Sequence, residues 1–147
     1  SLNDVIKIST KIAEPFAVQN RVALRTDLDE TIPIISFDPL RIRQACVNLL
    51  SNAVKFSQEG EAVTIVSRNA TEEVVVSVQD RGTGIDAEDI PGLFEKFNQL
   101  DGGSSRKRDG LGIGLRLVKH YVELHGGRVW VTSEKGVGST FWFSLPK

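Results

Sequence analysis

The segment AVTIVSRNATEEVVVSVQDRGTG, residues 62–84, decides the fold that this sequence predicts. Residues 62–68 and 74–80 are rich in β-branched side chains, which favour strands, and the short link 69–73 separates them. Two strands this close in the chain are expected to pair as an antiparallel hairpin. The sheet is therefore expected to include this hairpin.

Helical and extended patterns alternate on both sides of this hairpin. Apolar residues recur at helical spacing near the start of the chain, and Asp38 followed by Pro39 is a favourable helix start. The elements expected outside the hairpin are a helix over 2–19, a strand over 21–28, a helix over 39–56, short helical turns over 86–97, a mobile polar loop over 98–109, a helix from about Leu111 to Gly126, and strands over 128–133 and 139–145.

Because the two clear strand pairs are hairpins, we predict a mixed, mainly antiparallel sheet with helices packed on one face. This architecture is an α/β sandwich and differs from a doubly wound fold. The chain has 147 residues, 40% of them apolar, which suits a single domain with a buried core.

Charge and cysteine content argue against several classes of function. The net charge of -1, from 18 basic and 19 acidic residues, does not indicate electrostatic binding to nucleic acid or to an anionic membrane. A single cysteine rules out an internal disulfide and fits a reducing compartment. No apolar run approaches about 18 residues, and the start of the chain lacks a signal-peptide pattern. We therefore expect a cytoplasmic domain without direct membrane contact.

A polar stripe follows the helix predicted over 39–56. Gln44, Asn48, Asn52 and Lys55 are spaced to share one face of that helix. Asparagine is a poor residue for a helix interior, and a solvated stripe would favour lysine or glutamate. The stripe is thus either a solvated face or a set of side chains presented to a ligand.

The sequence DRGTG, residues 80–84, follows the second strand of the hairpin. The alternation that turns Val76 and Val78 toward the core also turns Asp80 toward it. A carboxylate on the core side is costly unless another group donates a hydrogen bond to it. The pattern fits both an ordinary glycine turn with a capping aspartate and a ligand-binding carboxylate.

A third signal is the alternation of Gly110, Gly112 and Gly114 at the predicted start of a helix. Backbone amides at a helix N-terminus can bind phosphate, and the helix dipole adds to that attraction. The pattern is not a Walker A motif, because no Lys-Ser or Lys-Thr pair follows, and no strand immediately precedes it as in a Rossmann fold. The preceding cations, Arg106, Lys107 and Arg108, either reach the phosphates or serve only solubility.

In this order and spacing the three signals resemble the nucleotide-binding catalytic domain of a sensor histidine kinase. That domain belongs to the fold shared with gyrase B, the Hsp90 chaperone and MutL. The resemblance covers about Leu2 to Pro146 and implies ATP and Mg²⁺ as cofactors. The residues that it assigns to ATP binding are Asn48, Asn52, Lys55, Phe56, Asp80, Gly82, Gly84, Ile85, Phe97, Arg106, Lys107, Gly110, Leu111, Gly112, Ile113, Gly114, Leu115 and Ser139.

The resemblance also implies a role for most of these residues. Asn52 would bind Mg²⁺ through its amide oxygen, with Asn48 and Lys55 serving the metal shell and the phosphates. Asp80 would accept from the exocyclic amine of adenine. The other implied roles are close backbone approach to the base at Gly82 and Gly84, packing on the ring by Ile85, a water-mediated contact from Ser139, and anchoring of a lid by Phe94 and Phe97. The lid itself, residues 99–109, is expected to become ordered only when the triphosphate binds.

The implied function is transfer of the ATP γ-phosphate to a histidine on a separate dimerisation helix of a two-component sensor kinase. Its partners would be the upstream dimerisation and phosphoacceptor helices and a response regulator, with a monomeric fragment and a homodimeric full-length protein. The alternatives are an ATP-hydrolysing conformational switch of the gyrase or Hsp90 class and a catalytically silent regulatory domain. In the hydrolases a glutamate stands where this chain has Asn48, and an amide is no base at neutral pH.

The remaining conspicuous side chains are expected to be structural. Cys46 lies on the buried side of its predicted helix. His120 and His125 lack the setting of a metal site or of the phosphoacceptor, and His125 suits a helix C-terminus. Trp130 and Trp142 should be neighbours on the outer face of the last hairpin.

Overall fold

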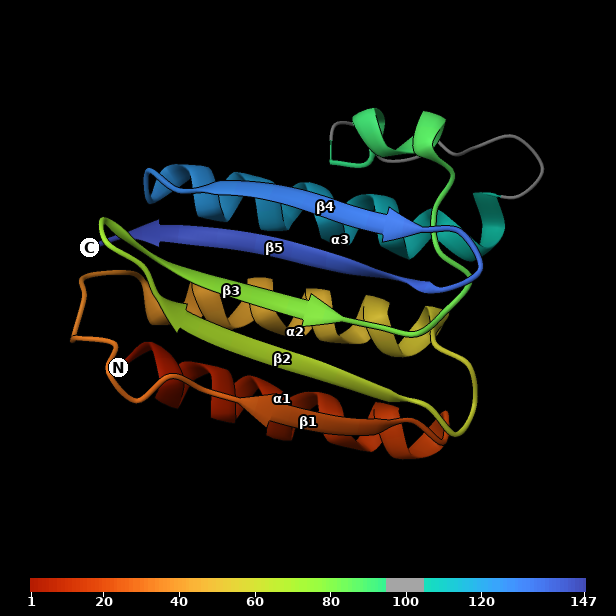
Figure 1. Ribbon diagram of the computed structural model, residues 1–147, viewed down its shortest axis with the longest axis horizontal. Coiled ribbons are helices and arrows are strands. Elements are labelled where there is room, and N and C mark those ends of the chain that lie inside the picture. Colours follow the sequence, from red (N-terminus) through yellow and green to blue (C-terminus); the bar gives the residue numbers. More distant parts are fainter. Residues whose placement is uncertain (95–104) are drawn as a thin grey trace.

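The computed structural model describes residues 1–94 and 105–147, and of residues 105–113 it describes only the backbone. The described elements confirm the expected alternation of helices and hairpins (Figure 1). In chain order they are α1 (Leu2–Gln19), β1 (Ala23–Asp27), α2 (Pro39–Phe56), β2 (Ala62–Asn69), β3 (Glu73–Gln79), the 3₁₀ helix η1 (Ala87–Gly92), α3 (Ser105–Leu124), β4 (Arg128–Glu134) and β5 (Gly138–Pro146).

The strands form one sheet in the order β1-β2-β3-β5-β4. Only β1 and β2 pair in parallel among the described strands, and the pairs β2–β3, β3–β5 and β4–β5 are antiparallel. The helices α1, α2 and α3 all cover the same face of this sheet (Figure 1). The predicted α/β sandwich with a mixed, mainly antiparallel sheet is confirmed.

The core lies between the sheet and this helical layer. Alternate residues of the strands point into it, and apolar stripes of the helices meet them. Burial of these side chains supplies the main stabilisation of the fold. The fully buried members include Val63, Ile65, Val74, Val76, Val78 and Phe143 from the sheet, and Ile42, Leu49, Leu50, Leu115, Val118 and Val122 from α2 and α3.

The outer face of the sheet carries the predicted tryptophan pair. Trp130 and Trp142 are register partners on β4 and β5, and their rings stack at 5.7 Å with 4° between the planes. The guanidinium of Arg128 lies 4.2 Å from the centre of the Trp130 ring. Cross-strand stacking and a cation–π contact therefore stabilise this hairpin.

Helix α2 has the predicted bounds, and two sets of hydrogen bonds at Asp38 fix its start. The Asp38 carboxylate accepts from the amides of Leu40 and Arg41 at 3.0 and 3.3 Å. The Asp38 amide donates to Nε2 of His125 at 2.9 Å, so Nδ1 of His125 carries the proton and donates to the Tyr121 carbonyl at 2.7 Å. His125 thus joins the end of α3 to the start of α2, which is a structural role.

Helix α3 differs from the prediction at its start. The helix was expected from about Leu111, after a loop over 98–109, but it begins at Ser105. Arginine and lysine at 106–108 are good helix formers. The prediction of a loop is therefore wrong for 105–109, whereas 98–104 lie outside the described residues. No helix in the described part of the chain is long and apolar enough to cross a membrane.

A polar network fixes the connection between β1 and α2 at the end of the sheet where β2 finishes. The Asp29 carboxylate accepts from the Thr31 amide at 2.9 Å and from the Asn69 amide at 3.0 Å. The Asp29 amide donates to Ser67 Oγ at 3.0 Å, and the Asp29 carbonyl accepts from Asn3 at 2.9 Å. Ser67 Oγ in turn donates to Asn3 Oδ1 at 2.8 Å. These bonds lower the pKa of the Asp29 carboxyl, chiefly through Thr31.

Candidate nucleotide-binding site

The predicted site residues of α2 and β3 gather at the opposite end of the sheet. There the C-terminus of α2, the loop after β3 and the turn between β4 and β5 meet, at the right of Figure 1. Ser57 forms an isolated antiparallel bridge with Gly82, and the Gly136 amide donates to the Thr83 carbonyl at 2.7 Å. The fold therefore brings together two of the three signals read from the sequence.

Asp80 is buried at this junction, as its place in the strand alternation predicts. Only 4% of the residue is exposed. Its Oδ1 accepts from the amides of Gly82, at 2.9 Å, and Ser139, at 3.2 Å. Burial raises the pKa of the Asp80 carboxyl, and the two amide donors only partly oppose that rise. Both donors reach the same oxygen, so no described residue donates to Oδ2.

The glycines after Asp80 are required by the chain's own packing. A Cβ atom at Gly82 would collide with the Phe56 carbonyl oxygen. Gly84 has a φ of 76°, and a Cβ there would collide with the Glu134 carbonyl oxygen. The glycines thus allow α2 and the β4–β5 turn to close on the Asp80 loop, a long-range reason that the local pattern did not show.

The asparagines of the polar stripe differ in how their amides are used. Asn48 Oδ1 accepts from Gln44 at 2.8 Å, and Asn48 Nδ2 donates to the Gly114 carbonyl at 3.3 Å. Asn52 is only 7% exposed, and its buried Nδ2 has no hydrogen-bond partner among the described residues. A buried amide without a partner is costly, and a ligand is one explanation for it. The stripe is therefore not simply a solvated face.

These asparagines line a cavity of about 240 Å³ between the helices. Its other lining residues are Phe16, Ser51, Lys55 and Gly114. Phe16, 37% exposed, was not among the predicted site residues, because its place in the apolar pattern of α1 made it look like a core residue. The cavity joins an amide-lined wall, a cation and an aromatic ring.

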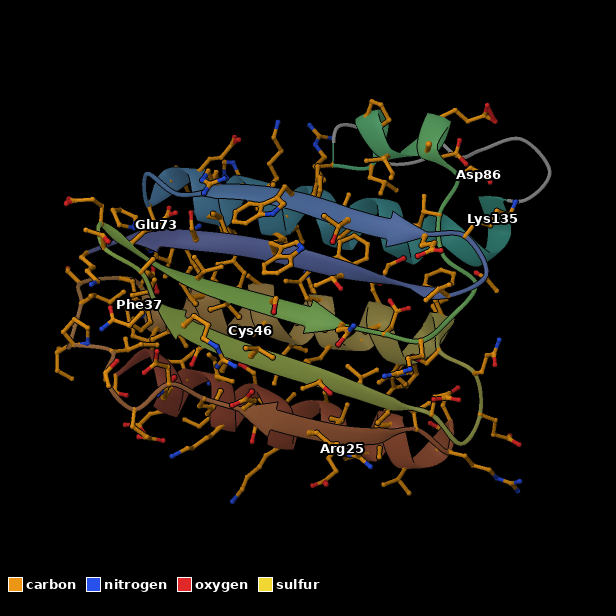
Figure 2. All side chains as sticks on the ribbon, viewed as in Figure 1. Arg25, Phe37, Cys46, Glu73, Asp86 and Lys135 are labelled. Carbon is orange, nitrogen blue, oxygen red and sulfur yellow. The ribbon has the colours of Figure 1, made fainter. Side chains whose placement is uncertain are left out.

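Lys55 also lines a larger hollow of about 530 Å³ next to the Asp80 loop. Phe56, Thr83 and Gly84 contribute to its walls, with Asp86 and Lys135 at one side. Figure 2 labels these last two side chains, whose charged groups pair at 2.8 Å. Asp86 raises the pKa of Lys135, which keeps a second cation beside Lys55 at the hollow.

Sequence reasoning missed Ser133, which joins three parts of the site. Its Oγ accepts from the Ile85 amide at 2.8 Å and donates to the Gly138 carbonyl at 3.1 Å. Ser139 Oγ lies 2.8 Å from Ser133 Oγ. Only the register of β4 and β5, which pairs Ser133 with Ser139, could have revealed this contact. Ser139 itself is 6% exposed and lies on the core face with Phe141, as predicted.

The glycine-rich segment lies inside α3, which differs from the predicted arrangement. The unpaired amides of a helix are its first four, and here those belong to 105–108 and not to 110–114. Leu115 is fully buried in the core. Phe97 lies outside the described residues, and the side chains of Arg106, Lys107, Leu111 and Ile113 are not described. Phe94 packs edge-to-face on Phe141 with 6.2 Å between ring centres.

Other reactive groups in the described part of the chain do not form a second centre. Cys46 is fully buried, and burial raises its pKa to about 12, so its thiol is inert as a nucleophile. The described residues contain no group of three or more His, Cys, Asp or Glu side chains that could hold a metal ion.

Comparison with known proteins agrees with this geometry. Residues 37–147 match the model of the histidine kinase-, DNA gyrase B- and HSP90-like ATPase family. The chain is 40% identical over 153 residues to the sensor protein GacS of Pseudomonas syringae pv. syringae. That match covers 99% of this chain but 16% of GacS, so the chain spans a small part of that relative.

Two solved structures show the same architecture. Full-length ShkA in complex with AMPPNP superposes with a TM-score of 0.85 at 29% identity, covering 99% of this chain and 30% of ShkA. The catalytic domain of the histidine kinase ThkA, in a nucleotide-free form, gives a TM-score of 0.83 at 25% identity and covers 99% and 92%. This chain is thus an ATP-binding domain of the histidine kinase type, and it belongs to the histidine kinase-, DNA gyrase B- and HSP90-like ATPase family.

Proposed function

We propose that this domain binds Mg-ATP and donates the γ-phosphate to a histidine on a separate dimerisation helix of a two-component sensor kinase. The observation that carries the proposal is the carboxylate of Asp80: the residue is 4% exposed, and described residues donate to only one of its two oxygens. Its Oδ2 would accept from the exocyclic amine of adenine. Guanine has a carbonyl oxygen at that position, and an acceptor facing a carboxylate is repelled.

The donor set around the smaller cavity fits Mg²⁺ that arrives with a triphosphate. Amide oxygens are hard ligands of the type that Mg²⁺ prefers, and one or two protein ligands suffice when phosphate oxygens and water supply the rest. Asn52 would bind the ion, with Asn48 held beside it by Gln44 and Gly114. Bound Mg²⁺ would supply charge neutralisation at the phosphates. Lys55, which lines both hollows, would orient the triphosphate and offset its charge.

The transfer step needs positioning more than covalent chemistry from this chain. The bond between the γ-phosphorus and the bridging oxygen breaks, and a bond from phosphorus to an imidazole nitrogen of the partner helix forms. ADP leaves with the bridging oxygen. The imidazole proton passes to the carboxylate of an acidic residue beside the acceptor histidine. The task of this domain is therefore to hold the γ-phosphate in line with that nitrogen.

An ATP-hydrolysing switch is less well supported by the residues present. Hydrolysis needs a base to activate water, and Asn48 at the corresponding position is an amide held by two hydrogen bonds. A silent regulatory domain would not need the unpaired buried amide of Asn52. We therefore place this domain in a cytoplasmic kinase that acts as a homodimer and passes phosphate to a response regulator. The net charge of -1 offers no support for a nucleic-acid partner or direct membrane contact.

The test is phosphate transfer from γ-labelled ATP, followed by thin-layer analysis. The isolated chain, expected to be a monomer and to form the whole of one catalytic domain, should bind ATP but release almost no phosphate and label neither His120 nor His125. Joining it to an acceptor helix should produce a labelled histidine. Brisk phosphate release by the isolated chain would instead favour the ATPase switch.

A further inference from the structure

Ser133 connects the Asp80 loop to the hairpin that carries Ser139. Its Oγ receives the Ile85 amide at 2.8 Å, and its hydroxyl reaches the Gly138 carbonyl at 3.1 Å. The side chain of Ser139 lies 2.8 Å away on the register partner. One hydroxyl group thus contacts the loop after β3, the start of β5 and the side chain of Ser139, whose amide donates to Asp80.

We propose that Ser133 is a positioning residue that sets the purine selectivity of this site. The inference rests on the proposed function, because it assumes that adenine binds at Asp80. Ser133 itself need not touch the nucleotide. It acts by holding the Ile85 backbone in place and by fixing the direction of the Ser139 hydroxyl.

The direction of the Ser139 hydroxyl follows from counting protons. A serine hydroxyl has a single hydrogen, and the Gly138 carbonyl can only accept, so the Ser133 hydrogen points to Gly138. The contact between the two serine oxygens then requires Ser139 to donate to Ser133. Ser139 Oγ is therefore left with lone pairs only for any further partner.

A hydroxyl that can only accept suits adenine and disfavours guanine. The Ser139 hydroxyl and the Asp80 carboxylate both present hydrogen-bond acceptors to the 6-position of the purine, either directly or through a water that donates to Ser139. The amine of adenine can donate to these acceptors, whereas the carbonyl oxygen of guanine is itself an acceptor and is repelled by them. If Ser133 were absent, the Ser139 hydroxyl would be free to turn and donate to guanine.

The hydrogen bond from the Ile85 amide to Ser133 also fixes the position of the loop after β3 relative to the proposed adenine site. Ile85 follows Gly84, which has a φ of 76° and approaches the Glu134 carbonyl so closely that a Cβ atom would collide with it. The Gly136 amide holds one side of the loop at Thr83, and Ser133 holds the other side at Ile85. Loss of the second contact would release Ile85, the residue expected to pack on the ring.

The test compares Ser133→Ala and Ser133→Thr with the parent chain by calorimetry with ATP and with GTP. In Ser133→Ala we expect ATP affinity to fall about tenfold and the ATP-to-GTP affinity ratio to fall at least about fivefold. Ser133→Thr keeps the hydroxyl and should restore the ratio to within about threefold of the parent. A ratio that is unchanged in Ser133→Ala would overturn the inference.

Ser67→Ala is the matched control, because Ser67 Oγ also links separate segments of the chain, through two hydrogen bonds at the far end of the sheet. It should lower the unfolding midpoint but keep the parent's ATP-to-GTP ratio. An equal drop of the ratio in Ser67→Ala would mean that general destabilisation causes the effect, which contradicts a positioning role for Ser133.

Amide hydrogen exchange of Ile85 in the nucleotide-free chain gives a readout that does not depend on ATP. Exchange should accelerate about tenfold in Ser133→Ala and not in Ser133→Thr. An unaltered Ile85 rate in Ser133→Ala would refute the positioning role even if ATP binds. If the parent binds neither nucleotide, the proposed function fails, and the Ile85 comparison alone then decides whether Ser133 holds the loop.

Discussion

The two ends of the sheet bury the same kinds of polar side chain and treat them differently. Asn3 and Asn52 are both 7% exposed, yet Asn3 is hydrogen bonded through both atoms of its amide, and Nδ2 of Asn52 has no partner among the described residues. Asp29 has donors on both carboxylate oxygens, whereas the donors of Asp80 reach only one. The pKa of Asp29 is lowered and that of Asp80 is raised.

On the proposed function, this difference separates groups that stabilise the fold from groups that a nucleotide would complete. The far end also holds one exception, because Asn69 Oδ1 is buried without a partner among the described residues. The near end differs in combining several such groups: Asn52 and Lys55 line the smaller cavity, Lys55 also lines the larger hollow next to the Asp80 loop, and among the described residues neither Asn52 Nδ2 nor one oxygen of Asp80 has a hydrogen-bond donor or acceptor. Several neighbouring polar groups with unused hydrogen-bonding capacity indicate a binding site better than a single buried atom without a partner does.

The largest expected effect contrasts the two buried asparagines. Asn52→Ala should reduce phosphotransfer by about 100- to 1000-fold in a chain joined to an acceptor helix, because the proposed protein ligand of the Mg²⁺ at the phosphates is lost. Its ATP affinity should change much less. Asn3→Ala should cost about 1–3 kcal/mol of unfolding free energy, because Ser67 and Asp29 lose a partner, and should leave transfer intact. Transfer that survives in Asn52→Ala would contradict the metal role of Asn52.

The two aspartates give the next largest contrast. Asp80→Asn should weaken ATP binding by about 1–3 kcal/mol, since the amide offers a donor where adenine also donates. The same variant should be no less stable than the parent at neutral pH, because a buried charge is removed. Asp29→Asn should lower the melting temperature and leave ATP binding alone. Calorimetry and thermal unfolding of both variants test the contrast, and equal ATP affinity in Asp80→Asn would remove Asp80 from the site.

The pH dependence of ATP binding sharpens the same comparison. Because the pKa of Asp80 is raised from 3.8, its ionised form and its ability to accept are lost at a higher pH than for an ordinary aspartate. Asp80 and Asp29 also affect folding stability in opposite senses. The contribution of Asp80 to the free energy of unfolding is present at low pH and is lost as pH rises through its raised pKa. The contribution of Asp29 is present at higher pH and is lost as pH falls through its lowered pKa. The affinity difference between the parent and Asp80→Asn should shrink as the medium is acidified. Titration of ATP itself cancels in that difference, and a constant difference down to pH 4 would contradict the shift.

The smallest effect concerns one exposed ion pair at each end. Lys135 pairs with Asp86 at 2.8 Å near the larger hollow, and Arg68 pairs with Asp27 at 2.8 Å at the far end. Neither Lys135→Ala nor Arg68→Ala should change stability measurably, because solvent screens exposed pairs. Only Lys135→Ala should reduce the salt dependence of ATP affinity. An identical salt response in both variants would show that Lys135 does not act on the nucleotide.

Local chemistry predicted much of the fold from the sequence. The Asp38-Pro39 pair gave the start of α2 because capping involves neighbours in the chain, and strand alternation placed Asp80 on the core side because its period is two residues. The antiparallel sheet followed from two short links between strands. These rules need no knowledge of what lies across the molecule.

The parts that could not be predicted depend on contacts between distant segments. Gly82 is required by the Phe56 carbonyl, and Ser133 meets Ser139 only through the register of β4 and β5. The start of α3 was misplaced because glycines were read as the beginning of a helix that in fact continues through them from Ser105. The network around Asp29 was missed because its members lie in segments far apart in the chain, with Asn3 in α1, and Ser67 and Asn69 in β2.

The position of β5 has a consequence for synthesis. Of the five strands of this sheet β5 is the last to be synthesised, yet it lies between β3 and β4 in the folded sheet. Until it arrives, β3 presents an open edge, and Asp80 lacks the amide of Ser139. A translation product truncated before Gly138 would therefore lack part of the proposed adenine site as well as a central strand of its sheet. Nucleotide would stabilise only chains that already contain β5, so binding would depend on synthesis of the whole sheet.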